Sequence, residues 1–270
     1  MVQQRNVANG KETCRWCDAC GTLLLGDKCF SCGSEGREFE INSPGDIRPC
    51  MGDSAELVKG LFRRAFGTDA PVSGCQMFLN KVPGEDRTDE IIANGTVLGI
   101  IRFDMRSDCI VLEIRQPGAD LFCNHATKNT VVFGGMSGHL KGKTVPGANV
   151  TDVIGEFNEG EPLILKKGQK VGPGIALVSS GGMRTSDRSV KIRDLNAPAQ
   201  TVSVKSDLNT FVKCNKGHIR RLAKRAVSEI RRFLDEKNKG GLPVTVSFSG
   251  GKDSLVAYGL ASEAVGKPEL

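Results

Sequence analysis

The 270-residue sequence has few aromatic side chains, at 5% of residues, with a single Trp and a single Tyr. It has no run of the roughly 18 to 20 apolar residues that a membrane helix needs, and its first residues contain no apolar signal segment. We therefore expect neither one broad aromatic core nor a membrane span, and we expect a cytoplasmic protein. The 33 glycines favour several small, turn-rich modules.

Positive charge is in excess in only one part of the chain. The formal net charge is +6, from 37 Lys and Arg against 31 Asp and Glu. Residues 211–240 hold ten basic and three acidic side chains, whereas residues 1–210 are balanced. The charge pattern therefore predicts a local binding site for a polyanion and not a generally basic protein.

Half of the ten cysteines lie within residues 12–33, which indicates a metal site in a compartment where thiols stay reduced. Two Cys-x2-Cys pairs stand out, each followed by a glycine whose freedom at positive φ lets a turn wrap two thiolates around one ion. The four candidate ligands are Cys17, Cys20, Cys29 and Cys32. Their spacing predicts a structural four-thiolate zinc site in a zinc ribbon over residues 12–40.

Two alternatives to zinc stay open at this point. Cys14, Cys17 and Cys20 form a Cys-x2-Cys-x2-Cys run of the kind that iron–sulfur proteins use, although the Cys-Pro that completes a bacterial ferredoxin run is missing. The cysteines could also carry no metal. In the zinc interpretation Cys14 is the spare thiol, and the ion stabilises a ribbon that is too small to fold without it.

The middle of the chain predicts two β-containing modules. Apolar residues at helical spacing predict a helix over residues 53–66, and Asn94-Gly95 between two apolar runs predicts a β-hairpin. The modules that follow the ribbon are an α+β insert with β-hairpins over residues 50–125, a β-rich unit over residues 130–195 and a linker over residues 196–210.

Three segments of the β-rich unit match a known domain pattern, namely residues 141–147 (KGKTVPG), 157–161 (FNEGE) and 174–176 (GIA). With them, residues 130–195 resemble a PUA domain, a small pseudo-barrel found in RNA-modifying enzymes. The resemblance implies an RNA-binding domain in which Gly142 and Lys143 contact the RNA. The alternative is a spacer, because a fold does not by itself fix a function.

The basic segment has the periodicity of a long helix from about Lys216 to Lys239. Basic residues off its apolar stripe include Arg220, Arg221, Lys224 and Arg225. They could follow the phosphates of an RNA such as tRNA, with an affinity that falls steeply with salt. The plainer alternative is a solvated face, or a face that pairs with acidic residues of a further domain.

The segment Ser249-Gly250-Gly251-Lys252-Asp253-Ser254 follows an apolar run at residues 242–248, which predicts a strand, and precedes a predicted helix. Glycine amides, two hydroxyls and a helix N-terminus can converge there on an anion. The segment is not a Walker A loop, which needs an earlier glycine and a Ser or Thr directly after the Lys. An ordinary Gly-Gly-Lys-Asp turn is the alternative.

These six residues resemble the SGGxDS signature of the PP-loop ATP pyrophosphatase superfamily. The resemblance implies binding of ATP or phosphoadenosine phosphosulfate, with magnesium, through phosphate contacts from Ser249, Gly250, Gly251 and Ser254. It also implies that Asp253 assists magnesium or the loop shape, while Lys252 can assist a phosphate. Residues 211–270 would then be the start of a PP-loop, Rossmann-like α/β domain, and we expect the chain to be the N-terminal portion of a longer protein.

The order of modules resembles archaeal proteins of the phosphoadenosine phosphosulfate reductase-like family that have an added PUA domain. The expected fold is multidomain α+β: zinc ribbon, β-rich insert, PUA-like pseudo-barrel, then the first strand and helix of an incomplete PP-loop domain. The resemblance implies a sulfur-metabolism enzyme with a reductant or sulfur-carrier partner, or an RNA-directed enzyme that adenylates or thiolates tRNA. A catalytically inactive RNA-binding fragment is the third alternative. The sequence assigns no catalytic residue and no membrane partner.

Overall fold

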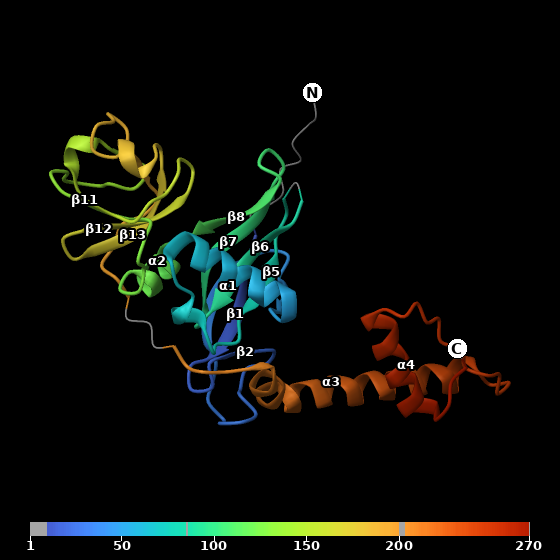
Figure 1. Ribbon diagram of the computed structural model, residues 1–270. Coiled ribbons are helices and arrows are strands. Elements are labelled where there is room, and N and C mark those ends of the chain that lie inside the picture. The colour runs from blue at the N-terminus through green and yellow to red at the C-terminus, as the bar shows by residue number, and fades with distance from the viewer. Residues whose placement is uncertain (1–9, 85, 200–202, 270) are drawn as a thin grey trace.

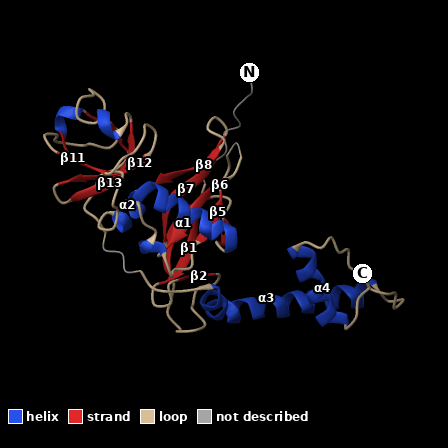
Figure 2. Cartoon of the chain, viewed as in Figure 1, coloured by secondary structure: helices blue, strands red, loops and turns tan. Residues whose placement is uncertain are grey.

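The computed structural model describes residues 10–84, 86–199 and 203–269, and within them it shows a mixed α+β chain with three sheets and four α-helices (Figure 1, Figure 2). The sheets follow one another along the sequence. In Figure 1 the third sheet, coloured yellow-green, lies on one side of the second sheet, and the two C-terminal helices extend away on the other side.

The first sheet is a small antiparallel ribbon with the strand order β2-β1-β3. Its strands are β1 (Lys11–Cys17), β2 (Thr22–Leu24) and β3 (Arg37–Asn42). In β3, Phe39 and Ile41 are buried, whereas Glu38 and Glu40 are exposed, as expected for a strand with one covered face. That covered face packs on the second sheet, where Trp16 and Phe39 share a core with Phe78.

The second sheet is a five-stranded antiparallel meander with the order β4-β5-β6-β7-β8. Its strands are β4 (Asp46–Pro49), β5 (Phe78–Lys81), β6 (Thr88–Ala93), β7 (Thr96–Asp104) and β8 (Cys109–Ile114). The predicted hairpin is confirmed, because Asn94 and Gly95 join β6 to β7 with φ angles of 52° and 66°. Both turn residues thus adopt the left-handed conformation that a two-residue hairpin loop requires.

Two helices cover the other face of this sheet. Helix α1 (Gly52–Phe66) confirms the helix expected from apolar spacing, and helix α2 (Gln116–Phe122) follows β8. The rings of Phe62 and Phe122 are fully buried and stack with their centroids 4.6 Å apart. This aromatic contact holds the two helices together over the sheet.

The third sheet has six strands in the order β10-β14-β13-β12-β9-β11, and only the β9–β12 pair is parallel. Its strands are β9 (Thr130–Phe133), β10 (Thr144–Val145), β11 (Val150–Ile154), β12 (Pro162–Lys167), β13 (Lys170–Ala176) and β14 (Val190–Ile192). Short 3-10 helices span Ala70–Val72, Gly147–Asn149 and Ser180–Gly182. We call residues 129–196 the β module.

The β module and the second sheet share a hydrophobic core. Leu163 and Leu165 of β12 face the core of the β module, whereas Ile164 between them packs with Phe62 and Phe122 of the insert. Successive side chains of a strand point to opposite faces, so β12 contributes to both cores at once. The two units are therefore in direct contact and not joined by a linker alone.

The last two helices are α3 (Leu208–Lys237) and α4 (Lys252–Val265). Helix α3 begins earlier than the apolar periodicity predicts, because Asp207 and Thr210 form a capping box with a 2.8 Å bond from the Thr210 amide to Asp207 Oδ1. The expected linker over residues 196–210 thus ends at Asp207 in the structure, and its residues 200–202 lie outside the described residues.

The strand expected over residues 242–248 is not formed. Only Thr245 pairs there, in a parallel bridge to Glu269, with bonds from the Val246 amide to the Glu269 carbonyl and from the Glu269 amide to the Val244 carbonyl, both 2.9 Å. A strand needs neighbouring strands to satisfy its backbone groups, and the described residues supply one pairing position. The apolar run over residues 242–248 is therefore not sufficient by itself to predict a strand.

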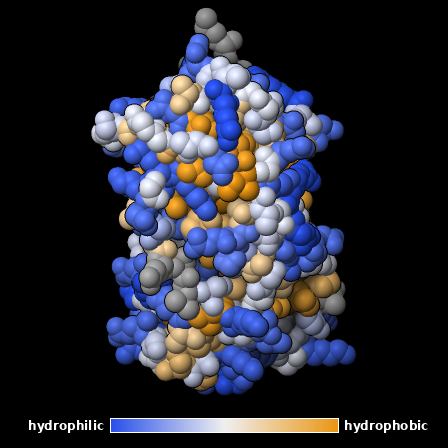
Figure 3. Space-filling model, turned by 60° about the vertical axis from the view of Figure 1, so that its left-hand side comes forward, coloured by the Kyte–Doolittle hydropathy of each residue, from blue (hydrophilic) through white to orange (hydrophobic). Residues whose placement is uncertain are grey.

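One face of the molecule is mainly hydrophilic. Figure 3 shows hydrophilic residues over most of one face, with a broad apolar area in its upper half. Within the described residues, no helix is both long enough and apolar enough to cross a membrane.

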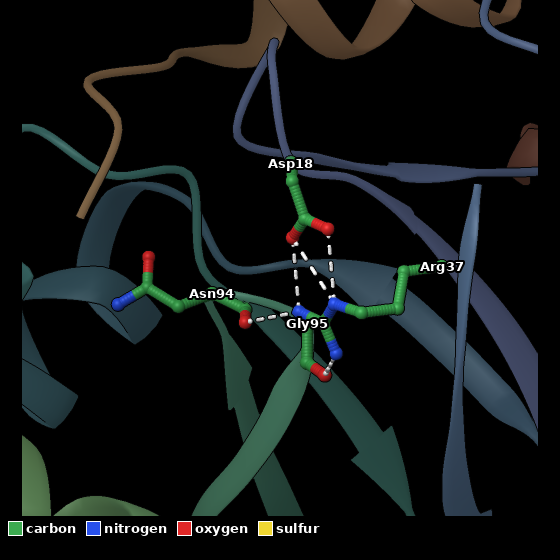
Figure 4. Close-up of polar contacts among 4 residues, drawn as sticks. All are labelled: Asp18, Arg37, Asn94 and Gly95. Carbon is green, nitrogen blue, oxygen red and sulfur yellow. Dashed lines mark hydrogen bonds and ion pairs between the residues drawn. The ribbon is translucent and has the colours of Figure 1, made fainter. Parts of the chain in front are cut away.

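The ribbon is held against the β6–β7 turn by one arginine. Arg37 donates from Nε and Nη2 to the Asp18 carboxylate at 3.0 and 2.9 Å, and it also donates to the carbonyls of Asn94 and Gly95 at 3.1 and 3.3 Å (Figure 4). Trp16 also lies against this turn, and a Cβ at Gly95 would come within 2.7 Å of Trp16 Cγ and within 2.5 Å of Arg37 Nη2. Only glycine therefore fits at position 95, where the ribbon contacts the β6–β7 turn.

We predict that Gly95→Ala destabilises the chain more than Gly52→Ala does. Both glycines have positive φ, at 66° and 53°, so either alanine costs about 1–2 kcal/mol of backbone strain. A Cβ at Gly52 meets nothing within 4 Å, whereas at Gly95 it also clashes with Trp16 and Arg37, which adds about 1–3 kcal/mol. Urea unfolding of both variants measures the difference, and equal losses would show that the joint tolerates the methyl group.

Candidate metal centre and anion-binding surfaces

Four cysteines of the ribbon form one cluster. The sulfur atoms of Cys17, Cys20, Cys29 and Cys32 all lie within 4.8 Å of one another. Each pair is closed by a turn in which the glycine after the second cysteine donates its amide to the carbonyl of the first, at 2.8 Å for Gly21 and 2.9 Å for Gly33. These glycines have φ of 63° and 75°. The turn geometry expected from the two Cys-x2-Cys-Gly motifs is confirmed.

The cluster is poised for a cation. Burial raises the pKa of the Cys17 thiol, and burial likewise raises the pKa of Cys20 to about 12. Cys32 is exposed, and hydrogen bonds from the side chain and amide of Ser34 lower its pKa to about 6. A bound divalent cation stabilises all of these thiolates, because its charge outweighs the cost of their burial.

The donor set suits a metal such as zinc. Four thiolates in two Cys-x2-Cys turns give the closed tetrahedral site typical of structural zinc, with no position left for a substrate. Cys14 does not join the cluster: it is half-buried and packs beside the core around Trp16. The Cys14-x2-Cys17-x2-Cys20 run is therefore not used as one ligand set.

A fifth thiol at the cluster was missed by the sequence reasoning. Cys214 of helix α3 is 1% exposed and belongs to the same buried group as Cys17 and Cys29. Burial, and next the neighbouring Cys29 side chain, raise the pKa of its thiol to about 12. No Cys-x2-Cys motif marks it, so the only signal in the sequence is a lone cysteine in a polar, basic helix.

The predicted phosphate loop has a compact but exposed geometry. Gly251 is the N-cap of α4, Gly250 has a φ of 77°, and Ser254 Oγ donates to the Gly251 carbonyl at 2.9 Å. The hydroxyl oxygens of Ser249 and Ser254 lie 3.3 Å apart. The loop therefore brings both serines of the motif together, with Lys252 and Asp253 exposed in the first turn of the helix.

The candidate RNA contacts fall on two separate surfaces. Gly142 and Lys143 are exposed on the β module, where the Gly142 amide donates to Ile192 and its carbonyl accepts from the ammonium of Lys191. The basic residues of α3 are also exposed, and among the described residues none of the following has an ion pair: Arg220, Arg221, Lys224 and Arg225. Figure 1 shows α3 well separated from the β module.

A small basic cavity lies on the β module. It has a volume of about 260 Å³ and lies between the loop after β9 and the β12–β13 turn. Its basic side chains are His139, Lys141, Lys167 and Lys170. One acid is present, Asp194, which pairs with Lys141 at 3.4 Å and accepts further hydrogen bonds from Leu195 and Asn196.

The sequence reasoning did not single out Lys167 and Lys170. They face each other across the two-residue Gly168-Gln169 turn, and neither has an ion pair in the described part of the chain. The signal that could have found them is the Lys166-Lys167-Gly168-Gln169-Lys170 run, in which a turn glycine separates closely spaced lysines.

Fold and site together define a multimodule α+β protein with a candidate metal centre and basic surfaces. No protein-family model matches the chain. Over 273 residues it is 29% identical to the uncharacterized protein MJ0066 of Methanocaldococcus jannaschii, covering 96% of the chain and 56% of that protein. Over 218 residues it is 25% identical to the uncharacterized protein MJ0973 of the same archaeon, covering 80% and 48%. The chain thus spans about half the length of these curated relatives.

Solved structures with some likeness to the chain include archaeal PUA domain proteins. A conserved PUA domain protein from Thermoplasma acidophilum aligns with a TM-score of 0.40 and 10% identity, over 54% of this chain and 91% of that one.

We predict that zinc affinity rises with pH. The thiols of Cys17 and Cys20 have raised pKa values, so they are protonated at neutral pH in the metal-free chain and must release their protons when zinc binds. Each proton released adds about one decade of affinity per pH unit, which gives at least about two decades between pH values of about 6.5 and 7.5. Competition with a chromophoric chelator at several pH values measures this slope. A flat profile would contradict thiolate ligation by Cys17 and Cys20.

Proposed function

We propose that the chain is an RNA-binding segment, in which the β module and helix α3 contact phosphates of an RNA such as tRNA. The single observation on which this rests is the basic cavity of the β module. Three lysines converge there on a space whose one carboxylate is already engaged. Such an enclosed excess of positive charge attracts an anion more strongly than lysines spread over a surface.

The size of the cavity favours a phosphate group. At about 260 Å³ it is smaller than the roughly 300–1,000 Å³ of most small-molecule sites. Lys167 and Lys170 both line it and are register partners at the end of the β12–β13 hairpin, so their ammonium groups can bind the same phosphate. The resemblance of residues 130–195 to PUA domains supports RNA as the source of that phosphate.

Helix α3 provides a second basic surface. Arg220, Arg221, Lys224 and Arg225 are exposed, have no ion pair with any residue that the structure describes, and lie within two turns of one another. Phosphate contacts of this kind orient a protein on a nucleic acid without reading its sequence. In this proposal the metal ribbon has a structural role, because α3 packs on it.

A second candidate function is nucleotide binding at residues 249–254. The observation in its favour is the parallel bridge between Thr245 and Glu269, which lie on either side of helix α4. A parallel pairing across one helix is the unit from which Rossmann-like sheets are built. The PP-loop resemblance would place the phosphates of ATP or phosphoadenosine phosphosulfate, with magnesium, at the Ser249 and Ser254 hydroxyls.

Exposed apolar side chains support a larger α/β domain around this loop. Leu255 and Val256 of α4 are 60% and 62% exposed, and Phe233 of α3 is 61% exposed. Further strands packed on α4 would cover them. Of the two enzyme classes implied by the resemblance, the RNA-directed one agrees better with the basic cavity, since reduction of a small sulfonucleotide needs no RNA-binding module.

We predict that Lys167→Ala/Lys170→Ala weakens binding to total tRNA and lowers the slope of log affinity against log salt by about two, one for each lost phosphate contact. Filter retention of labelled tRNA at several salt concentrations measures both quantities. Lys59→Ala/Lys81→Ala is the matched control, because it removes the same charge from the α+β insert and should change the slope little.

Two results would contradict the RNA proposal. One is that the chain without substitutions fails to retain labelled tRNA on the filter even at low salt. The other is an equal loss in the test and control variants, because that would reflect net charge alone. Arg220→Ala/Arg225→Ala reports separately on α3.

For the loop, we predict weak binding of pyrophosphate, ATP and phosphoadenosine phosphosulfate alike, with dissociation constants of about 1 mM in the presence of magnesium. The loop residues are exposed and offer phosphate contacts only. Changes in the amide chemical shifts of Gly250 and Gly251 on addition of ligand measure this binding. The double variant Ser249→Ala/Ser254→Ala should abolish these changes. Micromolar binding of one nucleotide would mean that this chain also recognises the base.

A further inference from the structure

Helix α3 reaches the cysteine cluster with its second turn. Cys214 is buried there in one cluster with Cys17, Leu24 and Cys29, and the partly buried Cys20 packs against this cluster. The Cys214 carbonyl also accepts a 2.8 Å bond from the amide of Phe30, in the turn between the two ligands of the second pair. Both the side chain and the backbone of this residue thus contact the candidate metal site.

The next residue fixes the helix to β2. Asn215 is 2% exposed, and its Oδ1 accepts from the Leu25 amide at 2.7 Å. Its Nδ2 donates to the Leu23 carbonyl at 2.9 Å and to the Phe211 carbonyl at the same distance. A buried amide with all of these bonds satisfied prescribes one position of the helix on the ribbon.

The surfaces of helix and ribbon approach too closely for other residues. A Cβ at Gly217 of α3 would come within 2.4 Å of the Phe30 ring, and a Cβ at Gly26 within 2.7 Å of His218 Nδ1. The first turns of α3 are therefore packed on the loops that hold Cys29 and Cys32.

We propose that Cys214 is a positioning residue of the metal centre, whose thiol hydrogen-bonds to the sulfur atoms of Cys20 and Cys29 and so couples metal binding to the docking of helix α3. The inference rests on metal binding at the four-cysteine cluster and not on the RNA proposal. A thiolate on a metal accepts a hydrogen bond better than a neutral thiol does. Metal binding therefore strengthens the docking of α3, and by reciprocity the docked helix strengthens metal binding.

The coupling has a consequence for the rest of the chain. Helix α3 presents the basic residues at 220–225, and its far end packs against α4, where Arg231 donates to the carbonyls of Glu263 and Ala264 at 2.8 and 3.1 Å. A metal ion in the ribbon thus sets the direction of a helix that leads to the loop at residues 249–254. The ion therefore orders a segment that supplies none of its four ligands.

The test compares Cys214→Ala and Cys214→Ser with Cys14→Ala, which removes a half-buried thiol outside the cluster. Zinc stoichiometry, zinc affinity by chelator competition, and amide hydrogen exchange of residues 208–219 are measured on the whole chain. We expect one zinc per chain in every variant, because the four ligands are intact. Affinity should fall about tenfold in Cys214→Ala, less in Cys214→Ser, and not in Cys14→Ala.

Hydrogen exchange gives the readout that a space-filling role would not produce. In the unchanged chain, zinc removal should raise the exchange of residues 212–219, and in Cys214→Ala this zinc dependence should shrink. The inference is overturned if Cys214→Ala retains both the affinity and the zinc-dependent protection of the unchanged chain. It is also overturned if that variant loses stoichiometric zinc, because Cys214 would then be a ligand. None of these readouts involves RNA, so a failure here is distinct from a failure of the RNA proposal.

Discussion

The contact between the cysteine cluster and helix α3 is the constraint on which the arrangement of this chain depends. A ribbon of three short strands has too little core to hold a shape unaided, and four sulfur atoms within 4.8 Å supply the missing constraint when they share an ion. Cys214 and Asn215 then bind the C-terminal helices to the same ribbon. The N-terminal and C-terminal parts of the chain thus meet at a single buried site.

The other modules are joined by shared cores. The single tryptophan, Trp16, is edge-on to Phe78 of the second sheet, whose ring in turn meets Phe211 of α3. Ile164 of the β module packs into the insert core around Phe62. Few aromatic residues are present, and several of them lie at these joints, where a large, rigid side chain contributes the most contact area. Cores shared in this way fix the relative directions of the modules.

Acidic and basic side chains have different roles in this chain. Asp89 and Glu90, the buried carboxylates of the insert among the residues that the structure describes, both have partners: Asp89 pairs with Arg48 and Arg87, and Glu90 accepts hydrogen bonds from Asn42 and Asn80. Lys167 and Lys170 at the β12–β13 turn have no ion pair among the described residues, and neither do Arg220, Arg221 and Arg225 of α3. Acids are therefore used to build the interior, and unpaired bases remain for an external polyanion, which is why both basic surfaces are functional candidates.

The features that the sequence determined are local. The Cys-x2-Cys-Gly turns, the Asn94-Gly95 hairpin and helix α1 each depend on residues a few positions apart, so their geometry follows from φ preferences and periodicity. The tertiary structure decided what depends on distant partners: Cys214 as the fifth thiol, Lys167 and Lys170 beside Lys141, and Ile164 in the insert core. It also decided that residues 242–248 form no strand, because a strand needs hydrogen-bonding neighbours that no local pattern provides.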